Sequence, residues 1–316
     1  GHRRAKHGQS RDRQRPDVSH STPPRTGCRH LVAARTGEAF SFSGPEARHA
    51  VTVKRMGEGE RLELIDGTGI RLTLTITAAT GKDSLEGMVE SIVTTPEPTP
   101  RVTVVQAIPK SERAELAVDL ATQAGADEII AWQADRCVAK WDGKKAPKAV
   151  AKWQAAADSA AKQSRRARIP QVRGPLTTPQ LVHELTGGRD GASSNAPTVL
   201  VLHEEATVSI KDVPLTEDVV LLVGPEGGIT PAELDAFVAA GATPVRMGAT
   251  VLRSSSAGPA ALAALGERLG DVDLYVIDEV AVPDRLEQAV GEAERQDVLR
   301  RLLAQEVVDP EDLLLV

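Results

Sequence analysis

Hydrophobic and polar residues alternate one by one in the first third of the chain. Two runs, residues 62–64 and 70–76, place leucine or isoleucine at every second position. This pattern is typical of strands with one buried face, because successive side chains of a strand point to opposite faces. Asp66-Gly67 separates the runs as a turn signal, and a short helical segment, 45–53, precedes them. The pattern predicts a small β-barrel over residues 28–98.

The pattern changes after a stiff proline-rich linker at residues 96–100. Short apolar runs now alternate with amphipathic stretches of helical period. This alternation predicts a mainly parallel sheet covered by helices, an α/β domain over residues 99–270. The expected strands are 102–107, 128–132, 199–203, 219–223 and 243–247, and the expected helices are 111–125, 148–166, 231–240 and 255–269.

Three further segments carry no core pattern. Residues 1–27 are rich in arginine and poor in large apolar residues, which predicts a disordered basic tail. Contact with RNA and a merely solvated leader are both open for this tail. Residues 174–197 are rich in glycine and serine, and we expect them to be mobile. Residues 271–316 form a C-terminal extension with an expected charged helix at 283–305.

Composition narrows the class of protein. A chain of 316 residues suggests about two domains. Aromatic residues make up 2% of the chain, which argues against base-stacking RNA platforms, and the net charge of −6 leaves local basic patches to decide any nucleic-acid contact. The two cysteines form no CxxC pair, so we expect neither a zinc site nor any other metal. Without an apolar run of about 20 residues or a signal peptide, we expect a cytoplasmic protein with no membrane contact.

A tight glycine loop stands at residues 224–228, directly after the apolar run 219–223. Thr230, Pro231 and Glu233 then form a helix start with a capping box. The spacing fits neither a GxxxxGK[ST] phosphate loop nor a GxGxxG dinucleotide fingerprint. A tight turn without a ligand is therefore as consistent with the spacing as a ligand site. However, in a parallel sheet three strand ends followed by small residues can converge on one ligand. Such strand-to-helix junctions lie at 199–206, 219–228 and 245–265.

The junction motifs resemble one family closely, the ribosomal RNA small-subunit methyltransferase E (RsmE) family of the SPOUT superfamily. The resemblance rests on GPEGG at 224–228 and on MGATVLRSSSA at 247–257. Upstream, residues 107–132, 156–172 and 29–69 are similar to family segments in the same order, so the resemblance covers about residues 28–270. The chain departs from the family where many relatives have R-x-E-T-A, because Ser255 replaces the glutamate.

The resemblance implies a PUA-like barrel followed by a SPOUT domain with a C-terminal trefoil knot. It also implies a homodimer in which the last helix of the knot, with an Ala/Leu surface at 260–265, lies near the partner. The three junctions would form the knot and hold S-adenosylmethionine (SAM) in a bent shape. The implied cofactor-binding residues are Leu202, His203, Glu204, Val223, Gly224, Pro225, Glu226, Gly227, Gly228, Met247, Gly248, Val251, Leu252, Arg253 and Ala257.

The implied reaction is SAM-dependent methylation of N3 of a specific uridine in 16S rRNA of the small ribosomal subunit. Arg253 is the candidate to stabilise the anionic base, and Glu226 is the candidate to accept a proton or orient the uracil. Purely structural roles remain open for both residues. Arg253 could be a helix-cap or interface residue, and Glu226 could accept hydrogen bonds from backbone donors of its own loop. His203 is a weaker catalytic candidate than either. The expected RNA-binding residues are Lys54, Arg55, Lys110, Arg136, Arg165, Arg166 and Arg168.

Other functions remain as alternatives. A SPOUT enzyme acting on another RNA would share every motif described above. A non-catalytic RNA-binding assembly factor is favoured only by Ser255 in place of the family glutamate. A nucleotide-dependent oxidoreductase is the weakest alternative, because the dinucleotide fingerprint fails.

Overall fold

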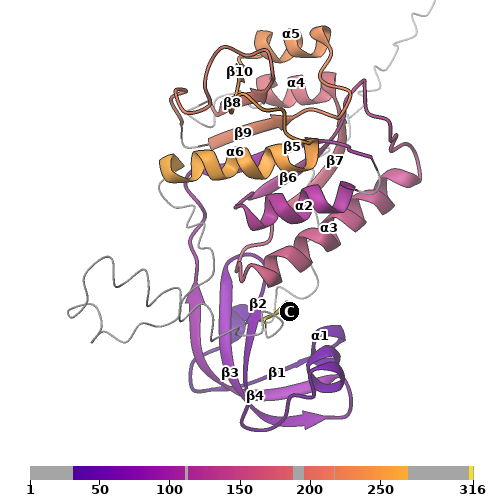
Figure 1. Ribbon diagram of the computed structural model, residues 1–316. Helices are drawn as coiled ribbons and strands as arrows, with labels where there is room; N and C mark the ends of the chain where they lie inside the picture. The colour runs from indigo at the N-terminus through magenta and orange to yellow at the C-terminus, as the bar shows by residue number, and fades with distance from the viewer. Residues whose placement is uncertain (1–30, 111–112, 188–195, 217, 270–312, 316) are drawn as a thin grey trace, which may run out of the picture.

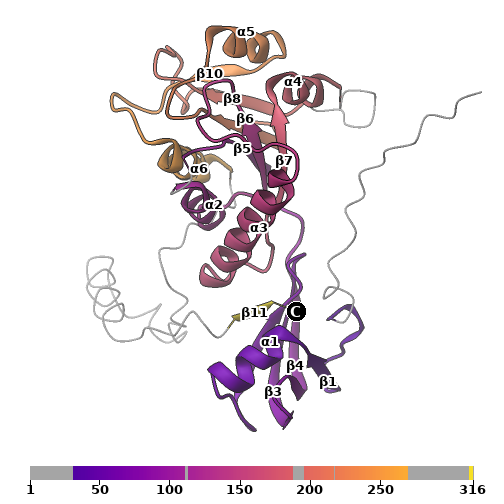
Figure 2. The same ribbon diagram turned by 90° about the vertical axis from the view of Figure 1, so that its right-hand side faces the viewer.

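A computed structural model describes residues 31–110, 113–187, 196–216, 218–269 and 313–315. These residues form two hydrophobic cores that share no residue, a smaller one under an antiparallel sheet and a larger one around a parallel sheet. The two parts lie end to end (Figures 1 and 2). The predicted basic tail, the helix cap at Ser111 and the charged helix at 283–305 lie outside the described residues.

The smaller part is a five-stranded sheet in the order β1-β4-β3-β2-β11. The neighbouring pairs from β1 to β2 are antiparallel, and β11 pairs with β2 in parallel. Its strands are β1 (Ala39–Ser43), β2 (Arg61–Ile65), β3 (Ile70–Thr80), β4 (Ser84–Thr94) and β11 (Leu313–Leu315), and its helical turns are η1 (Leu31–Ala33), α1 (Pro45–Arg48) and the π-helical η2 (His49–Val53).

The period-two pattern predicted the buried face of this sheet. Leu62, Leu64, Leu72 and Leu74 are each 1% exposed or less and pack with Ala47 and Ala50 from the helical turns. The turn at residues 66–70 forms because the buried Asp66 carboxylate accepts hydrogen bonds from the backbone N–H groups of Thr68 and Ile70, at 2.7 and 2.9 Å. The helical segment expected at 45–53 is confirmed as α1 and η2.

The larger part is a six-stranded sheet, all parallel, in the order β10-β8-β9-β5-β6-β7. Helices α2, α3 and α6 cover one face, and α4 and α5 cover the other (Figures 1 and 2). The strands are β5 (Arg101–Ala107), β6 (Glu128–Gln133), β7 (Gln171–Thr177), β8 (Thr198–Leu202), β9 (Asp218–Val223) and β10 (Thr243–Val245). The helices are α2 (Ala114–Gln123), α3 (Lys145–Gln163), α4 (Thr178–Gly187), α5 (Pro231–Ala239) and α6 (Ser254–Leu269).

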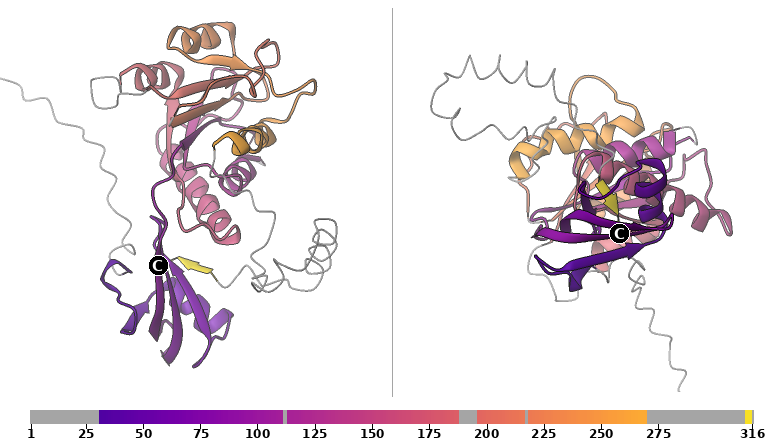
Figure 3. Two further views of the ribbon diagram at one scale, coloured as in Figure 1. Left: turned by 90° about the vertical axis from the view of Figure 1, so that its left-hand side faces the viewer. Right: turned by 90° about the horizontal axis from the view of Figure 1, so that it is seen from below.

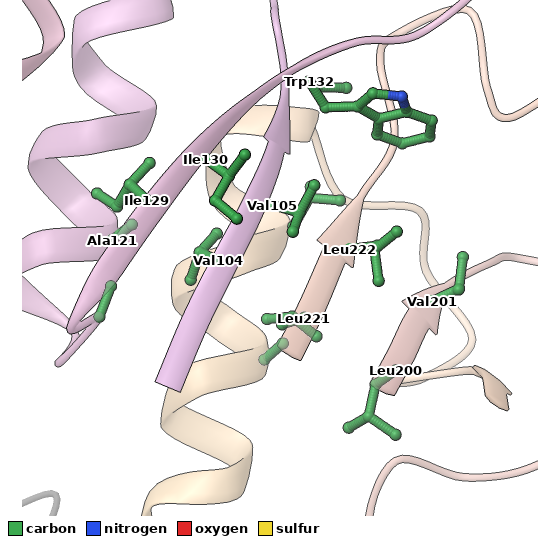
Figure 4. Packing of buried hydrophobic residues seen from close by; sticks show 14 of the residues in the cluster. Val104, Val105, Ala121, Ile129, Ile130, Trp132, Leu200, Val201, Leu221 and Leu222 are labelled. Atoms are coloured by element: carbon green, nitrogen blue, oxygen red, sulfur yellow. The ribbon is translucent and has the colours of Figure 1, made fainter. Parts of the chain in front are cut away.

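Both faces of this sheet are buried, which is why its strands read as continuous apolar runs. Across neighbouring strands, Val104, Leu221 and Leu200 share one face, while their neighbours in sequence turn to the other face (Figure 4). On the α4–α5 side, the rings of Trp132 and Phe237 pack edge to face with centroids 5.2 Å apart. This packing fixes α5 against the carboxyl end of β6.

One prediction was wrong between residues 174 and 187. We expected a mobile glycine- and serine-rich segment, but the chain forms the end of β7 and the whole of α4. Gly174 and Pro175 resemble a loop signal, yet β7 is an edge strand, where proline costs no ladder hydrogen bond. The left-handed φ of Gly174 (107°) accompanies an irregularity in the pairing of β6 and β7.

The end of α3 also differs from the prediction. The helix begins at Lys145, stops at Gln163 and does not reach residue 166, because Arg165 takes a left-handed φ of 53°. The segment 165–169 then runs between the two sheets, where Ala167 and Ile169 pack on Ile65 of β2 (Figure 3). The segment therefore joins the two parts of the molecule.

Candidate functional site

The three junctions singled out in the sequence end at one edge of the larger sheet. Their strands β10, β8 and β9 are neighbours, so their carboxyl ends lie side by side. A hydrogen bond of 3.0 Å from the His203 backbone N–H to the Val245 carbonyl extends the pairing of β8 and β10 beyond the strands. Ligands in open parallel sheets bind beyond the carboxyl ends of the strands, which makes this edge the candidate site.

The glycine loop is shaped by close contacts with its own protein. A Cβ at Gly224 would lie 2.8 Å from Ile229 Cγ1, and a Cβ at Gly227 would lie 3.1 Å from Arg136 Cβ. Gly228 has a φ of 76°, which favours glycine because it lacks a Cβ. Internal packing therefore accounts for glycine at Gly224 and Gly227.

A buried carboxylate holds the start of α5 in place. Glu233 is 3% exposed and completes the predicted capping box with Thr230, whose backbone N–H donates to Glu233 Oε2 at 3.0 Å. Glu233 Oε1 accepts from the Asp135 backbone N–H at 2.9 Å and from the Thr178 hydroxyl at 2.8 Å. The indole N–H of Trp132 in turn donates to the same hydroxyl at 3.0 Å. One carboxylate thus ties α5 to the loop after β6 and to the start of α4.

Glu233 gives a pH-dependent prediction. Burial raises the pKa of Glu233, but the hydrogen bonds from Asp135, Thr230 and Thr178 outweigh it and leave the pKa below the ordinary value of 4.5. A lowered carboxyl pKa adds stability above the unfolded value and loses it as the pH falls through the folded value. We expect Glu233→Gln to lower the free energy of unfolding by about 1–3 kcal/mol at neutral pH.

The measurement is thermal or urea unfolding of both proteins from neutral pH down to about pH 3. The stability gap between wild type and Glu233→Gln should narrow below about pH 4.5. A gap that stays constant over this range would show that the ionised carboxylate does not hold the loop.

The third junction is tied to the glycine loop through a buried polar pair. Gln106 lies near the end of β5 and is 2% exposed. Its side-chain amide donates to the Ser254 hydroxyl at 3.0 Å, and that hydroxyl donates to the Gly224 carbonyl at 2.7 Å. The start of α6 is therefore fixed against the end of β9. Sequence reasoning missed both side chains, although a lone glutamine in the apolar run 102–107 is a signal that a polar partner exists.

The connection between β10 and α6 is the open side of the site. Val251 is 77% exposed and Leu252 is 41% exposed, which is unusual for apolar side chains beside a buried sheet edge. A Cβ at Gly248 would meet no atom within 4 Å. This connection therefore presents apolar groups and free space on the same edge as the glycine loop.

Comparison with known proteins identifies the family. A family model described as an RNA methyltransferase domain matches residues 95–266, and one described as an RNA methyltransferase PUA domain matches residues 42–88. The ribosomal RNA small subunit methyltransferase E of Mycobacterium tuberculosis (strain CDC 1551 / Oshkosh) is 50% identical over 233 residues, covering 73% of this chain and 87% of that protein. The chain belongs to the ribosomal RNA small subunit methyltransferase E family.

More distant members of the methyltransferase E family agree. The Bacillus subtilis (strain 168) protein of the same name is 27% identical over 236 residues, covering 72% of this chain and 89% of that protein. The crystal structure of a ribosomal RNA small subunit methyltransferase E from Neisseria gonorrhoeae, bound to S-adenosyl methionine, has a TM-score of 0.64 and 26% identity, covering 74% of this chain and 94% of that one. The sequence resemblance to this family is thereby confirmed.

For this methyltransferase E family member, the residues expected to bind cofactor are buried, half-buried or exposed. Val223 and Pro225 are buried, and Met247 and Ala257 pack against the larger core. Leu202 and His203 are half-buried, and Gly224 is half-buried. The exposed group is Glu204, Glu226, Gly227, Gly228, Gly248, Val251, Leu252 and Arg253.

The two catalytic candidates come from neighbouring junctions. Glu226 is exposed, and one of its carboxylate oxygens accepts a hydrogen bond of 3.2 Å from the backbone N–H of Lys110, three residues after the end of β5. Arg253 is exposed just before α6, and its carbonyl accepts from the backbone N–H groups of Ser256 and Ala257, both at 2.9 Å. The backbone of Arg253 therefore serves the helix start, while its side chain extends from the surface.

The expected RNA-binding residues do not form one surface. Lys110 and Arg136 lie at the sheet edge, where Arg136 donates to the Gly227 carbonyl at 3.0 Å. Lys54 and Arg55 follow η2 in the smaller part, and Arg55 is exposed. Arg165 is exposed at the turn after α3. Two of the expected residues, Arg166 and Arg168, are half-buried and bound to other groups of the protein.

Arg168 and Arg166 have structural partners. Arg168 donates to the carbonyls of Thr95 and Pro96, both at 2.9 Å, and pairs with Glu97 at 2.7 Å, so it is bound to the linker between the two parts. Arg166 donates to two backbone carbonyls and pairs with Asp127. We therefore no longer propose these two side chains for RNA contact.

Among the described residues, no group of three or more His, Cys, Asp or Glu side chains is placed to hold a metal ion. Burial raises the pKa of the Cys137 thiol, which makes this cysteine a poor nucleophile. In the same part of the chain, no helix combines the length and apolar character needed to span a bilayer.

Proposed function

We propose that this protein transfers the methyl group of S-adenosylmethionine to N3 of a specific uridine in 16S rRNA of the small ribosomal subunit. Family membership supports an RNA methyltransferase, and the convergence of three junctions at one sheet edge supports the location of its site. The position on the base and the identity of the nucleotide are the parts of the proposal that go beyond family membership.

The residues present at the sheet edge fit this cofactor. The exposed apolar side chains of Val251 and Leu252 can cover an apolar ring, and the backbone of the Gly224–Gly228 loop offers donors and acceptors beside them. Bound SAM supplies a methyl group already activated by its sulfonium. The remaining task of the protein is to align the attacking atom with that methyl, and such positioning can contribute several kcal/mol.

Gly248 provides a test of the cofactor site. Because a Cβ at Gly248 meets no protein atom within 4 Å, Gly248→Val should leave the thermal stability of the protein unchanged. A branched side chain in that space would instead meet the cofactor, and we expect SAM affinity to fall by at least about tenfold, which corresponds to about 1.4 kcal/mol. Titration calorimetry of the folded variant measures this.

A valine at Gly57 is the matched control, because that glycine in the smaller part also has almost no neighbour, its nearest atom being Glu60 Oε2 at 3.9 Å. Equal SAM affinity for wild type and Gly248→Val would place the cofactor elsewhere.

Two side chains are proposed for the chemistry at uridine N3. The N3 proton must leave during methyl transfer, and Glu226 has one carboxylate oxygen engaged by Lys110 while the other is available to accept a proton or orient the uracil. Arg253 lies at the start of α6, where its guanidinium and the positive end of the helix dipole would both stabilise an anionic base. His203 is not needed for either role.

We further propose that the connection from β10 to α6 forms a trefoil knot. The support is the path of the chain. Strand β10 is the outermost strand of the sheet, whereas the Ser254 hydroxyl at the start of α6 donates to the Gly224 carbonyl just after β9, two strands away. A homodimer in the cytoplasm is proposed by analogy with the family. Leu262 and Leu265, which we had expected on the dimer surface, belong to the core, so Ala263 and the exposed Leu116 on α2 are better candidates for the contact.

The decisive experiment is mass spectrometry of small-subunit rRNA from a strain lacking the gene, with and without the returned gene. The proposal predicts one methyluridine that disappears and returns. A modification that changes in another RNA would favour a SPOUT enzyme with a different substrate. No change in any RNA would favour the non-catalytic assembly factor, whose support is Ser255, a buried residue in place of the family glutamate.

A further inference from the structure

A basic segment, residues 135–148, runs from the end of β6 into the first turn of α3. It contains five basic residues, Arg136, Lys140, Lys144, Lys145 and Lys148, against two acidic ones, Asp135 and Asp142. The whole chain has a net charge of −6, so this local excess of positive charge runs against the overall balance. Such a patch determines which partners a surface attracts.

The lysines of the basic segment are exposed and weakly paired. Lys145 lies 3.9 Å from Asp142, and both side chains are 78% exposed, an arrangement that contributes little to stability. Within the described residues, Lys144 and Lys148 are exposed and have no acidic side chain within 4.0 Å. The charges of the basic segment are therefore available to a partner.

The start of α3 breaks the usual rules for helix stability. Helices favour Ser, Thr, Asp or Asn as the N-cap and acidic side chains in the first turn, because the helix dipole is positive there. Here the N-cap is Lys144 without a side-chain cap, and no acidic residue lies in the first turn. Local choices that oppose stability are expected at functional sites.

The basic segment is also held rigidly. The side chain of Gln133 donates to the Ala139 carbonyl at 3.0 Å and accepts from the Trp141 backbone N–H at 2.8 Å, so it clamps both sides of the loop. Trp141 packs edge to face on the buried Trp153 of α3, with ring centroids 4.8 Å apart. The lysines thus project from a fixed loop, which lowers the entropy cost of binding.

The basic segment is attached directly to the candidate site. Arg136 donates to the Gly227 carbonyl at 3.0 Å, and the Asp135 backbone N–H donates to Glu233 Oε1 at 2.9 Å. Its loop leaves β6 at the same sheet edge as the glycine loop (Figure 1). The basic segment therefore begins at the candidate site.

We propose that the basic segment binds the phosphate backbone of the RNA next to the nucleotide that is methylated. Lysines act on phosphates as point charges and read no sequence, so the contact would position the RNA without selecting the base. The inference rests on the proposed function, because it assigns the substrate contact to the same site. Unlike Arg166 and Arg168, Lys144 and Lys148 pair with no acidic side chain among the described residues.

The test is the double variant Lys144→Ser with Lys148→Ala. We expect its affinity for unmethylated small subunits to fall by about tenfold at moderate salt, and the slope of log K against log salt to drop by about 1 for each lysine removed. SAM affinity should not change. The melting temperature should stay constant or rise, because serine is a favoured N-cap. Filter binding across a salt series, calorimetry with SAM and thermal unfolding measure the three quantities.

The control is Lys82→Ser, which removes an exposed lysine from the turn between β3 and β4 of the smaller part. Unchanged binding and salt slope in the double variant, or an equal loss per lysine in the control, would overturn the proposal. Stronger binding of an acidic protein than of naked rRNA by the basic segment would also overturn it. If wild type binds subunits salt-dependently but methylates none of them, the proposed function fails while the RNA surface stands.

Discussion

Replacing Arg253 with alanine is expected to lower kcat for small-subunit methylation by about 10²- to 10³-fold, the usual loss when one preorganised donor to a developing charge is removed. SAM affinity should stay within about twofold, since the proposed contact forms only when the base becomes anionic. The exposed side chain lies just before α6, and the backbone carbonyl of Arg253 accepts the first hydrogen bonds of the helix, so alanine keeps the local fold.

The experiment is single-turnover methylation with labelled SAM, with SAM affinity measured separately by calorimetry. Arg253→Lys keeps the charge but loses the planar fork, so its rate should lie between those of wild type and alanine. Arg61→Ala removes an exposed arginine of the smaller sheet and is the control for general charge loss. If Arg253→Ala weakens SAM binding as much as it slows turnover, the residue holds the cofactor and does not act on the base.

Much of the fold follows from the sequence because the signals are local. Five of the six strands of the larger sheet were expected within a few residues, since burial on both faces forces continuous apolar runs, whereas the edge strand β7 was missed. The capping box of Thr230 and Glu233 was expected from three residues of sequence and is present. The same reasoning located the three junctions, but it could not show that their strands are neighbours, because the strand order depends on contacts distant in sequence.

The side chains that connect the junctions were beyond local reasoning. Gln106 and Ser254 are 148 residues apart, and their bond depends on the whole sheet being in place. The internal partners of Arg166 and Arg168 could not be predicted for a related reason. A run of basic residues at the end of a helix resembles a solvated face, but the left-handed turn at Arg165 directs the following side chains into the protein.

Arg166 therefore leads to a stability prediction in place of the RNA-binding one. It donates to the carbonyls of Thr122 and Ala126 at 2.6 and 2.7 Å and pairs with Asp127 at 3.1 Å, and the two charged side chains are 19% and 11% exposed. Asp127 also accepts from the Val102 backbone N–H at 2.9 Å. The pair thus links the turn after α2 to the start of β5, at the base of the larger sheet.

Removing one partner of a buried pair leaves the other charge without compensation, which costs about 3–5 kcal/mol. We expect Arg166→Ala to lower the free energy of unfolding by that amount, whereas Arg165→Ala, at the neighbouring exposed position, should change it by less than about 0.5 kcal/mol.

Burial already raises the pKa of Asp127, and losing Arg166 should raise this pKa further. A carboxyl whose pKa is higher in the folded than in the unfolded state favours folding at low pH, so the deficit of Arg166→Ala should shrink as the pH falls. Urea unfolding of the three proteins at several pH values tests both statements, and equal stability of the two variants would return Arg166 to the RNA surface.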